Sequence, residues 1–525
     1  MEIASSANLP RRTANYKPNI WNYDRFESLS SNYHEEKYVR EAETLKEEVG
    51  CALKKKQQDP FDRLELIDLI NKLGLSHYFE NEISECVNEI ACIKNISICM
   101  HHYHHHLLYF RILRQYGYHV PQDEIVQLLR SHFEWGDKAL VEIFEASHLE
   151  VEDEFLVDRA KAAISNVDDP PNYPTHWSVS WFNAKKYIKP ANKSVLHRLA
   201  GLSYNMIQAH HQMELKAILR WWRNLELLQV LTFTRDRVVE SFLWAVGVAY
   251  EPQYSSLRTW LTKAIVLVLI IDDVYDIYAS DHELDHFTTA VERWDPSEIE
   301  ELPEAIRRCF WTLYETTEEM DRQVQKEKGC KSILPHLKKL WTDFCKALHV
   351  EAKWYHTSLC PSLSEYLDNG WTSSSGPLLS FHILLGIGEN IAETMAAFNS
   401  NQEIIHQASL IIRLCNDQGT SKAEVERGDA PSSIRCYMIE ENATEEEGRG
   451  HMRNLISDSW KKINGLLIKT PATQQRMIRY VVNTARVANF IYQNGDGFGN
   501  QDRETRAQVL SCLIHPLPLI SHLPN

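Results

Sequence analysis

Apolar side chains recur at helical spacing along most of the chain. One apolar face begins at residues 64–70 and continues at residues 73 and 75, with the three- and four-residue steps of an α-helix. The stretches 202–228 and 306–328 contain neither Gly nor Pro, and the strict apolar–polar alternation of a half-buried strand is rare. The pattern therefore predicts an all-α protein.

A cluster of prolines interrupts the helical pattern. Pro170, Pro171, Pro174 and Pro190 lie between helical stretches, together with acidic and amide side chains. Because Gly and Pro are the strongest interruptions of regular structure, this cluster is the best candidate for a domain boundary. We expect an N-terminal helical domain over residues 1–190 and a C-terminal helical domain over residues 191–525, sizes within or just above the usual range.

The composition restricts the partners of the chain. Its 525 residues carry a net charge of −16, which disfavours nucleic acid and anionic membranes. An anionic substrate would need metal ions that reverse the local sign of charge. The aliphatic run 264–271 has only eight residues, too few to span a bilayer, so we expect no stable membrane insertion.

The cysteines and the start of the chain indicate the compartment. Eleven cysteines occur without any CxxC pair, which fits a reducing compartment better than a disulfide scaffold. Ten residues precede Arg11, which leaves little room for an organelle transit peptide, and they include no apolar signal-peptide core. We expect a cytoplasmic protein, and we expect it to be a monomer.

Three aspartates follow directly on the apolar run 264–271. Asp272 and Asp276 are one helical turn apart and share a face, and Asp273 accompanies them. If the apolar helix enters the interior, it presents carboxylates there, and buried carboxylates are costly without partners. Oxygen ligands of this kind favour Mg²⁺. The alternative is a solvated helix end.

A second set of oxygen ligands lies on another predicted helix. Asn416, Thr420 and Glu424 are spaced by four residues, which places them in one stripe. Arg413 lies three residues earlier on the same side, as expected if a polyanion bridges this cation and metal ions. A solvated polar face is the alternative interpretation.

Arginines and aromatic residues complete the candidate site. Arg235 and Arg237 would point to different faces of a helix, so both can reach one ligand only from a loop or a helix end. Arginine suits phosphate oxygens, although surface ion pairs are the simpler explanation. Trp244, Tyr492 and Phe498 are either pocket walls that stabilise a carbocation by cation–π contacts or ordinary core residues.

Histidines form the one biased segment, His101, His102, His104, His105 and His106. Helical spacing pairs His101 with His105 and His102 with His106, which is a possible adventitious metal site. An exposed helix start is the simpler reading of this segment.

Four motifs resemble those of plant terpene synthases, in the same order and spacing, and the likeness extends from Arg11 over essentially the whole chain. They are the aspartate-rich motif (Asp272, Asp273, Asp276), the second metal motif (Asn416, Asp417, Thr420, Glu424), the RDR loop (Arg235, Asp236, Arg237) and the RR(x)₈W motif (Arg11, Arg12, Trp21).

The resemblance implies a fold and a chemistry. The fold is two helical domains, with the active site in a C-terminal class I α-barrel and an N-terminal arm, bearing Arg11 and Arg12, folded over it. The six metal ligands named above would hold Mg²⁺, three ions per site, with Mn²⁺ as an alternative. The substrate would be a prenyl diphosphate, bound by the arginines (Arg413 included), by Asp272, Asp276 and Asn416, and by the three aromatic residues. No DxDD motif is present, so ionisation chemistry alone is implied.

Within the angiosperm RR(x)₈W clade, the segments RRTANYKPNIW, LVLIIDDVYDIY, NGWTSSS and NGDGFG are most similar to (E,E)-α-farnesene synthases. This likeness implies an acyclic sesquiterpene made from farnesyl diphosphate. The alternatives are a monoterpene synthase that makes β-ocimene from geranyl diphosphate, a chain-elongating prenyltransferase, and a silent helical scaffold.

Overall fold

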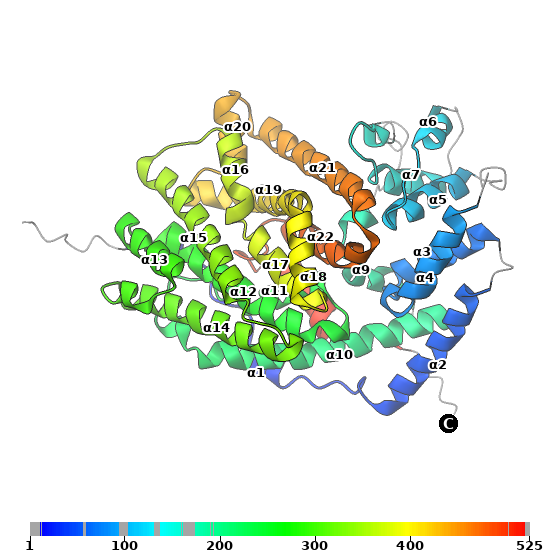
Figure 1. Cartoon of the computed structure of the whole chain (residues 1–525), viewed down its shortest axis with the longest axis horizontal. Coiled ribbons are helices and arrows are strands. Elements are labelled where there is room, and N and C mark those ends of the chain that lie inside the picture. The colour runs from blue at the N-terminus through cyan, green and yellow to red at the C-terminus, as the bar shows by residue number, and fades with distance from the viewer. Residues whose placement is uncertain are drawn as a thin grey trace, which may run out of the picture.

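The computed structural model describes residues 11, 13–55, 59–93, 103–130, 137–158, 160, 174–189, 191–192, 194–501 and 503–519. Within these ranges every regular element is a helix, so the all-α prediction is confirmed (Figure 1). Pro170, Pro171 and Pro190 of the expected boundary lie outside the described residues, as do Arg12, His101 and His102.

The α-helices of the first half are α1 (Tyr23–Glu27), α2 (Glu36–Leu53), α3 (Pro60–Lys72), α4 (Glu80–Ala91), α5 (Tyr103–Gln115), α6 (Asp123–Arg130), α7 (Asp137–Ser147), α9 (Ser180–Tyr187) and α10 (Val195–Asn224). Those of the second half are α11 (Val238–Val248), α12 (Ser255–Asp273), α13 (Asp281–Arg293), α14 (Glu304–Lys328), α15 (Leu334–Thr357), α16 (Leu363–Ser373), α17 (Gly376–Ile387), α18 (Ile391–Ser400), α19 (Gln402–Arg427), α20 (Ser433–Glu440), α21 (Glu445–Lys469), α22 (Ala472–Tyr492) and α23 (Arg503–Val509).

Shorter helical turns connect these helices. Two are π-helical, η6 (Val274–Tyr278) directly after α12 and η8 (Leu510–Ile514) after α23. The others are 3₁₀ turns, η1 (Ser76–Tyr78), η3 (Thr175–Trp177), η4 (Leu227–Gln229), η5 (Pro252–Tyr254) and η7 (Pro296–Ile299).

Left-handed residues decide where two of the expected helices end. Helix α3 ends at Lys72 because Gly74, with φ of 71°, turns the chain. Helix α10 ends at Asn224, four residues before the end of the expected stretch, because Glu226 has φ of 50° and the chain passes into η4. Neither stop shows in apolar periodicity alone.

The two halves of the chain share one apolar core. Buried side chains of α2, α3 and α4 belong to the same cluster as those of α11, α12, α17 and α22. Helices α6 and α7 form a separate smaller cluster, and α5 contributes side chains to both. Figure 1 shows α10 running beneath both halves, with α2 beside one end of it and α12 near the other. In the second half, α11, α12, α17, α19 and α22 each contact the next, and α22 closes the ring on α11.

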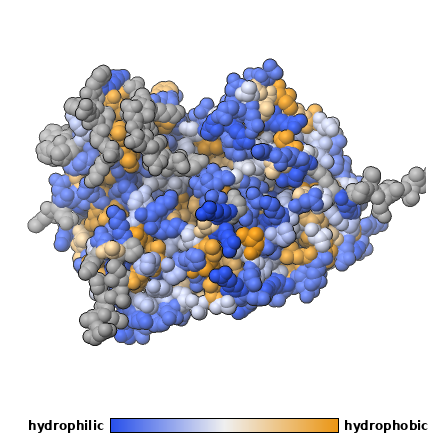
Figure 2. All heavy atoms as spheres, turned by 180° about the vertical axis from the view of Figure 1, so that it is seen from behind, coloured by the Kyte–Doolittle hydropathy of each residue, from blue (hydrophilic) through white to orange (hydrophobic). Residues whose placement is uncertain are grey.

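The visible surface mixes polar and apolar residues (Figure 2). Seen from behind, the molecule is mainly hydrophilic, and apolar residues are scattered in patches between polar ones (Figure 2). No helix among the described residues is both long enough and apolar enough to cross a bilayer.

A buried ion pair fastens α10 to α12. Arg258 is fully buried, and its Nε and Nη2 donate to the two carboxylate oxygens of Glu214 at 2.7 Å each. Its Nη1 donates to the carbonyls of Ala249 and Glu251, also at 2.7 Å. Burial acts to raise the pKa of Glu214, but hydrogen bonds from Arg258 and His210 outweigh it and lower that pKa to about 2.

We predict that Glu214→Gln destabilises the protein by about 3–5 kcal/mol, because it leaves the Arg258 guanidinium buried without its counter-charge. Urea unfolding measures this change. Lys339→Ala is the matched control, since Lys339 pairs with Asp343 on the exposed surface of α15 at 2.5 Å and should contribute only about 0.3–0.5 kcal/mol. Equal effects of the two substitutions would contradict the prediction.

Candidate active site

The three aspartates lie where α12 passes into the π-helical turn η6. Asp272 and Asp273 are the last residues of α12, and Asp276 lies within η6. Carboxylates at the C-terminal end of a helix face its negative dipole end, so this position needs nearby positive charge. Burial, followed by the charge of Asp272, raises the pKa of Asp276 well above its usual value.

The second set of oxygen ligands lies on α19 as expected. This helix is continuous from Gln402 to Arg427, so Asn416, Thr420 and Glu424 share one face of it. Burial, with the charge of Asp417, raises the pKa of Glu424 to about 8. Glu424 in turn contributes to the raised pKa of Asp276. The two sets of ligands therefore face each other across one acidic space.

Asp417 is the exception within the second motif. Its Oδ1 accepts a hydrogen bond from the Tyr366 hydroxyl at 3.1 Å, and its Oδ2 accepts from the Ser433 backbone N–H at 2.9 Å. The carboxylate is buried and fixes α19 to α16 and to the start of α20. In this arrangement it serves the packing of α19.

Arg235 is the principal counter-charge of the first motif. It lies in the loop before α11, and its Nη2 is 2.6 Å from Asp272 Oδ2 and 2.9 Å from Asp273 Oδ1. Its backbone N–H also donates to Asp273 Oδ2 at 2.9 Å. Burial still dominates over these cation contacts and raises the pKa of Asp273 to about 6.

Arg413 supplies the counter-charge on α19. Its Nη2 donates to Ser373 Oγ at 2.9 Å and lies 3.5 Å from Glu351 Oε1. Gly370 makes this position possible, because a Cβ there would lie 3.2 Å from Arg413 Cγ. Arg413 and Arg235 line the same pocket, together with Asp272 and Asn416.

Arg237 points elsewhere. It lies in the loop and helix end that the sequence required, and its guanidinium is buried. It donates to the backbone carbonyls of Phe498, Gly499 and Lys17, the last two at 3.3 Å. In this structure Arg237 joins the N-terminal arm to the loop after α22, whereas Arg235 alone contacts the aspartates.

An enclosed pocket lies below the carboxylates. Its free volume is about 100 Å³, and the ring of α11, α12, α17, α19 and α22 supplies most of its walls. Trp244, Tyr492 and Phe498 all line it, with ring centroids 5.7–6.4 Å apart. Ligand pockets usually measure roughly 300–1,000 Å³, so a prenyl chain enters only if these walls move.

The N-terminal arm covers the mouth of this region. Arg11 makes a two-pronged ion pair with Glu283 at 2.7 and 3.0 Å, and its guanidinium lies 4.2 Å from the centroid of the Tyr278 ring. Trp21 donates from Nε1 to Glu240 at 2.7 Å. Both contacts tie the arm to elements that flank the aspartates.

Several residues of the site were not expected from the sequence. Tyr16 of the arm lies between two cations, 5.1 Å from the Arg235 guanidinium and 5.9 Å from that of Arg427. Ser373, Ser374 and Ser375 line the pocket at a break between α16 and α17, where Ser375 has φ of 62°. The run Ser-Ser-Ser-Gly-Pro was the available signal for that break.

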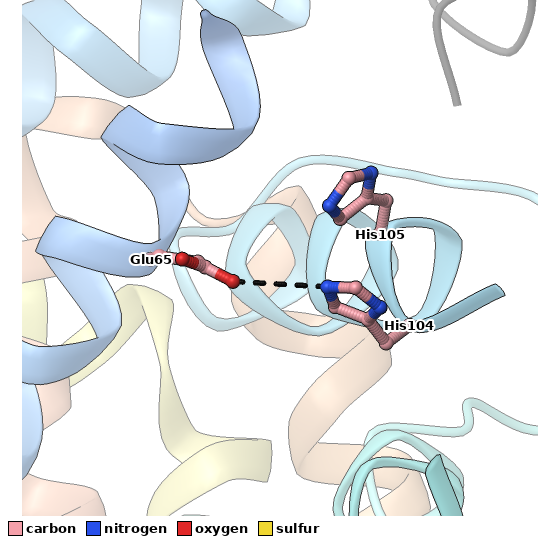
Figure 3. A group of neighbouring side chains, drawn as sticks. All are labelled: Glu65, His104 and His105. Atoms are coloured by element: carbon pink, nitrogen blue, oxygen red, sulfur yellow. Dashed lines mark ion pairs between the residues drawn. The ribbon is translucent and has the colours of Figure 1, made fainter. Parts of the chain in front are cut away.

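The histidine segment lies apart from this site. Figure 3 shows His104 of α5 directed toward Glu65 of α3, with Nε2 and Oε1 3.7 Å apart, and His105 beside it. His105 stacks on Phe61 with ring centroids 4.4 Å apart. The pairs expected from helical spacing include His101 and His102, outside the described residues, so they stay untested.

The donor set of the acidic space suits hard divalent cations. It offers carboxylate, amide and hydroxyl oxygens from two facing helices, whereas thiolates and imidazoles are absent from the predicted ligands. Burial, with neighbouring carboxylates, raises the pKa values of Asp276 and Glu424, so both groups favour additional positive charge nearby. Cations bound between the helices would relieve that repulsion.

Comparison with known proteins agrees with the geometry. The terpene synthase N-terminal domain matches residues 20–166, and the metal binding domain of the terpene synthase family matches residues 223–462. The α-farnesene synthase of Ricinus communis is 45% identical over 97% of this chain and 96% of its own length. The (E,E)-α-farnesene synthase of Malus domestica is 44% identical over 97% of this chain and 94% of its own.

A solved structure shares the whole fold. It is the isoprene synthase of grey poplar leaves (Populus x canescens) in complex with three Mg²⁺ ions and dimethylallyl-S-thiolodiphosphate. Its TM-score is 0.85 at 34% identity, over 96% of this chain and 100% of that one. The class I terpenoid synthase fold and the resemblance noted in the sequence are confirmed. The chain belongs to the terpene synthase family.

Proposed function

We propose that this terpene synthase, a lyase, converts (2E,6E)-farnesyl diphosphate to (E,E)-α-farnesene and diphosphate. The observation that carries the proposal is one pocket lined by oxygen ligands of α12 and α19, by two arginines and by three aromatic side chains. The two relatives named as farnesene synthases support the acyclic fifteen-carbon product.

The proposed metal ligands are the oxygen atoms of the two motifs. Asp272, Asp276, Asn416, Thr420 and Glu424 would hold Mg²⁺, with Asp273 as a further ligand that is now paired with Arg235. Three ions are proposed by analogy with the poplar enzyme, and Mn²⁺ as an alternative ion. When bound, Mg²⁺ neutralises the diphosphate and makes it a better leaving group.

The arginines would bind the same diphosphate. Arg235 and Arg413 both line the pocket beside Asp272, so a diphosphate bound there would receive charge-assisted hydrogen bonds from both. Arg237 would hold the loop after α22 in place through its carbonyl contacts. The arm with Arg11, followed in sequence by Arg12, would close the site and exclude water.

The chemistry then needs two bond changes. The allylic C–O bond breaks, its electron pair stays with the diphosphate oxygen, and a farnesyl cation remains. Trp244, Tyr492 and Phe498 would stabilise this cation through their ring faces. A proton then leaves the carbon next to the allyl unit, which gives the conjugated diene. We propose the departing diphosphate, retained by Arg235 and Arg413, as the base.

Three further proposals concern the whole chain. We propose that residues 1–190 and 191–525 are its two domains, since the two family matches fall on either side of residue 190. The monomeric state and the cytoplasmic location stay predictions. The β-ocimene alternative differs in substrate length, and the same product experiment separates it from the farnesene proposal.

We predict that Asp272→Ala or Asp276→Ala lowers turnover by roughly a hundredfold or more, because a lost metal ligand removes several kcal/mol of leaving-group stabilisation. Release of diphosphate from farnesyl diphosphate in Mg²⁺ measures this, and circular dichroism should show an intact fold. Asp343→Ala, at an exposed position of α15, is the control. Normal rates in either site variant would overturn the assignment.

We predict that Glu424→Gln raises the Mg²⁺ concentration needed for half-maximal turnover, because the amide binds a cation more weakly than the carboxylate. A Mg²⁺ titration of the initial rate measures the shift. Glu426→Gln is the matched control, since Glu426 lies two residues later on the exposed side of α19. Identical titrations for both variants would mean that the stripe on α19 is only a polar face.

We predict that the main product from farnesyl diphosphate is acyclic (E,E)-α-farnesene. Gas chromatography with geranyl and farnesyl diphosphates, tested side by side, identifies the product and the preferred substrate. A mainly cyclic sesquiterpene or a terpene alcohol would refute the prediction. Turnover of geranyl diphosphate alone, with β-ocimene as product, would favour the alternative.

A further inference from the structure

A polar crevice separates the N-terminal helices from α22, away from the acidic space. One cavity there has a volume of about 290 Å³ and a second about 550 Å³. The two share six lining residues, so they form one continuous crevice: Ser76, Tyr116, Ser180, Gln475, Arg479 and Asn483. We refer to it as the interdomain crevice. Its lining residues come mainly from α3, α4, α5, α9 and α22, helices that Figure 1 shows near the junction of the two halves of the chain.

The interdomain crevice is rich in cations, in contrast to the net charge of −16 of the chain. Besides the exposed Arg476, which lies 3.8 Å from Glu80, two of its arginines have carboxylate partners. Arg111 lies 2.8 Å from both Asp68 and Glu142. Arg114 donates to Glu154 at 2.5 and 2.6 Å. These two guanidiniums are therefore neutralised by the protein.

Arg479 and Arg486 of α22 lack such partners among the described residues. Arg479 makes no hydrogen bond or ion pair there and lies 5.3 Å over the Tyr116 ring. Arg486 donates to the His176 carbonyl at 2.7 Å and to Asn483 Oδ1 at 2.8 Å, both neutral acceptors. The two arginines are seven residues apart, two turns of one helix, so both side chains lie on the same face.

The carboxylates that line the interdomain crevice are otherwise engaged. Asp68 pairs with Arg111 and Lys72, and Glu80 lies 3.8 Å from the exposed Arg476. Glu251 accepts a hydrogen bond from the Tyr480 hydroxyl at 2.8 Å, and burial raises its pKa to about 7. None of them neutralises Arg479 or Arg486 by direct contact.

Partly buried cations without counter-charges are costly. Burial, together with the charge of Arg479, lowers the pKa of Arg486 to about 10. An anion in the interdomain crevice would remove this penalty. Two guanidiniums on one helix face fit the oxygen atoms of a tetrahedral oxyanion, and the neighbouring amide and hydroxyl groups can supply further donors.

We propose that the interdomain crevice is a binding site for a phosphate-class oxyanion, held by Arg479 and Arg486. Among the described residues, Leu467 is the single aliphatic side chain that lines the smaller cavity, where Arg486 lies, whereas Ile83, Val87 and Ala472 line the larger one. The polar lining around the two arginines favours an inorganic anion, either free phosphate or the diphosphate that the reaction releases. The site is separate from the proposed catalytic residues.

Isothermal titration of the full-length protein tests this proposal, with inorganic phosphate and inorganic diphosphate as separate probes. EDTA is present throughout, so that diphosphate cannot enter the active site with metal ions. We expect one saturable site per chain. Arg479→Gln should weaken binding about tenfold or more, since it removes a guanidinium that would donate charge-assisted hydrogen bonds to the anion. Tighter binding of diphosphate would identify the reaction product as the ligand, and tighter binding of phosphate would identify free phosphate.

Arg453→Gln is the matched control. Arg453 lies on α21, is exposed, lines neither cavity, and pairs with Glu446 at 3.0 Å. The substitution should leave the affinity within about twofold of the unmodified protein, because it removes only an exposed contact. Arg479→Gln should fold normally, because Arg479 makes no hydrogen bond or ion pair among the described residues. Phosphate should raise the melting temperature of the unmodified protein, and this rise should be absent in Arg479→Gln.

Two outcomes would overturn the proposal. One is the absence of saturable binding of either anion by the unmodified protein. The other is equal affinity in Arg479→Gln and in the unmodified protein. Neither outcome bears on the terpene synthase chemistry, which is measured separately with Mg²⁺ and a prenyl diphosphate.

Discussion

The catalytic half of this protein depends on the enclosure of acidic side chains from two helices in one space. Asp272 at the end of α12, Asp276 in η6 and Glu424 of α19 belong to this set, and burial with neighbouring carboxylates raises the pKa values of Asp276 and Glu424. Such a cluster is unfavourable unless positive charge accompanies it. Arg235 and Arg413 provide part of that charge. The remaining deficit of positive charge accounts for the affinity for divalent cations that we propose. Such cations would in turn bind a diphosphate.

The cover of the site is attached to the same loop that carries Arg235. Asp236 accepts hydrogen bonds from Asn19 at 2.9 Å and from Tyr23 at 2.5 Å, and Glu240 accepts from Trp21 and Gln501 at 2.7 Å each. Together with the carbonyl contacts of Arg237, these bonds bring the N-terminal arm and the segment after α22 to one short stretch. A movement of this loop would therefore displace both Arg235, which contacts the aspartates, and the N-terminal arm, which covers them. Opening of the small pocket is thereby coupled to the first motif.

Helix α22 takes part in two chemically different spaces. Its last residue, Tyr492, lines the catalytic pocket, whereas Arg486 and Arg479 face the interdomain crevice. Arg486 and Tyr492 are six residues apart, roughly 9 Å along the helix axis. An anion in the crevice would therefore bind to the helix that also supplies an aromatic wall of the active site, and the shared apolar core makes the two halves of the chain one packed unit.

The sequence by itself determined the helical class, the continuous stripe of Asn416, Thr420 and Glu424, and the motifs that assign the family, because periodicity and spacing are local properties. Only the tertiary structure decided which charged groups face each other. It turned Asp417 toward Tyr366 and Ser433, directed Arg237 to backbone carbonyls, and left Arg479 and Arg486 on the crevice without carboxylates. The physical reason is that these partners lie on other elements, from 16 to 310 positions away along the chain. Only the packing of the helices, which spacing in the sequence does not contain, brings them within hydrogen-bond distance.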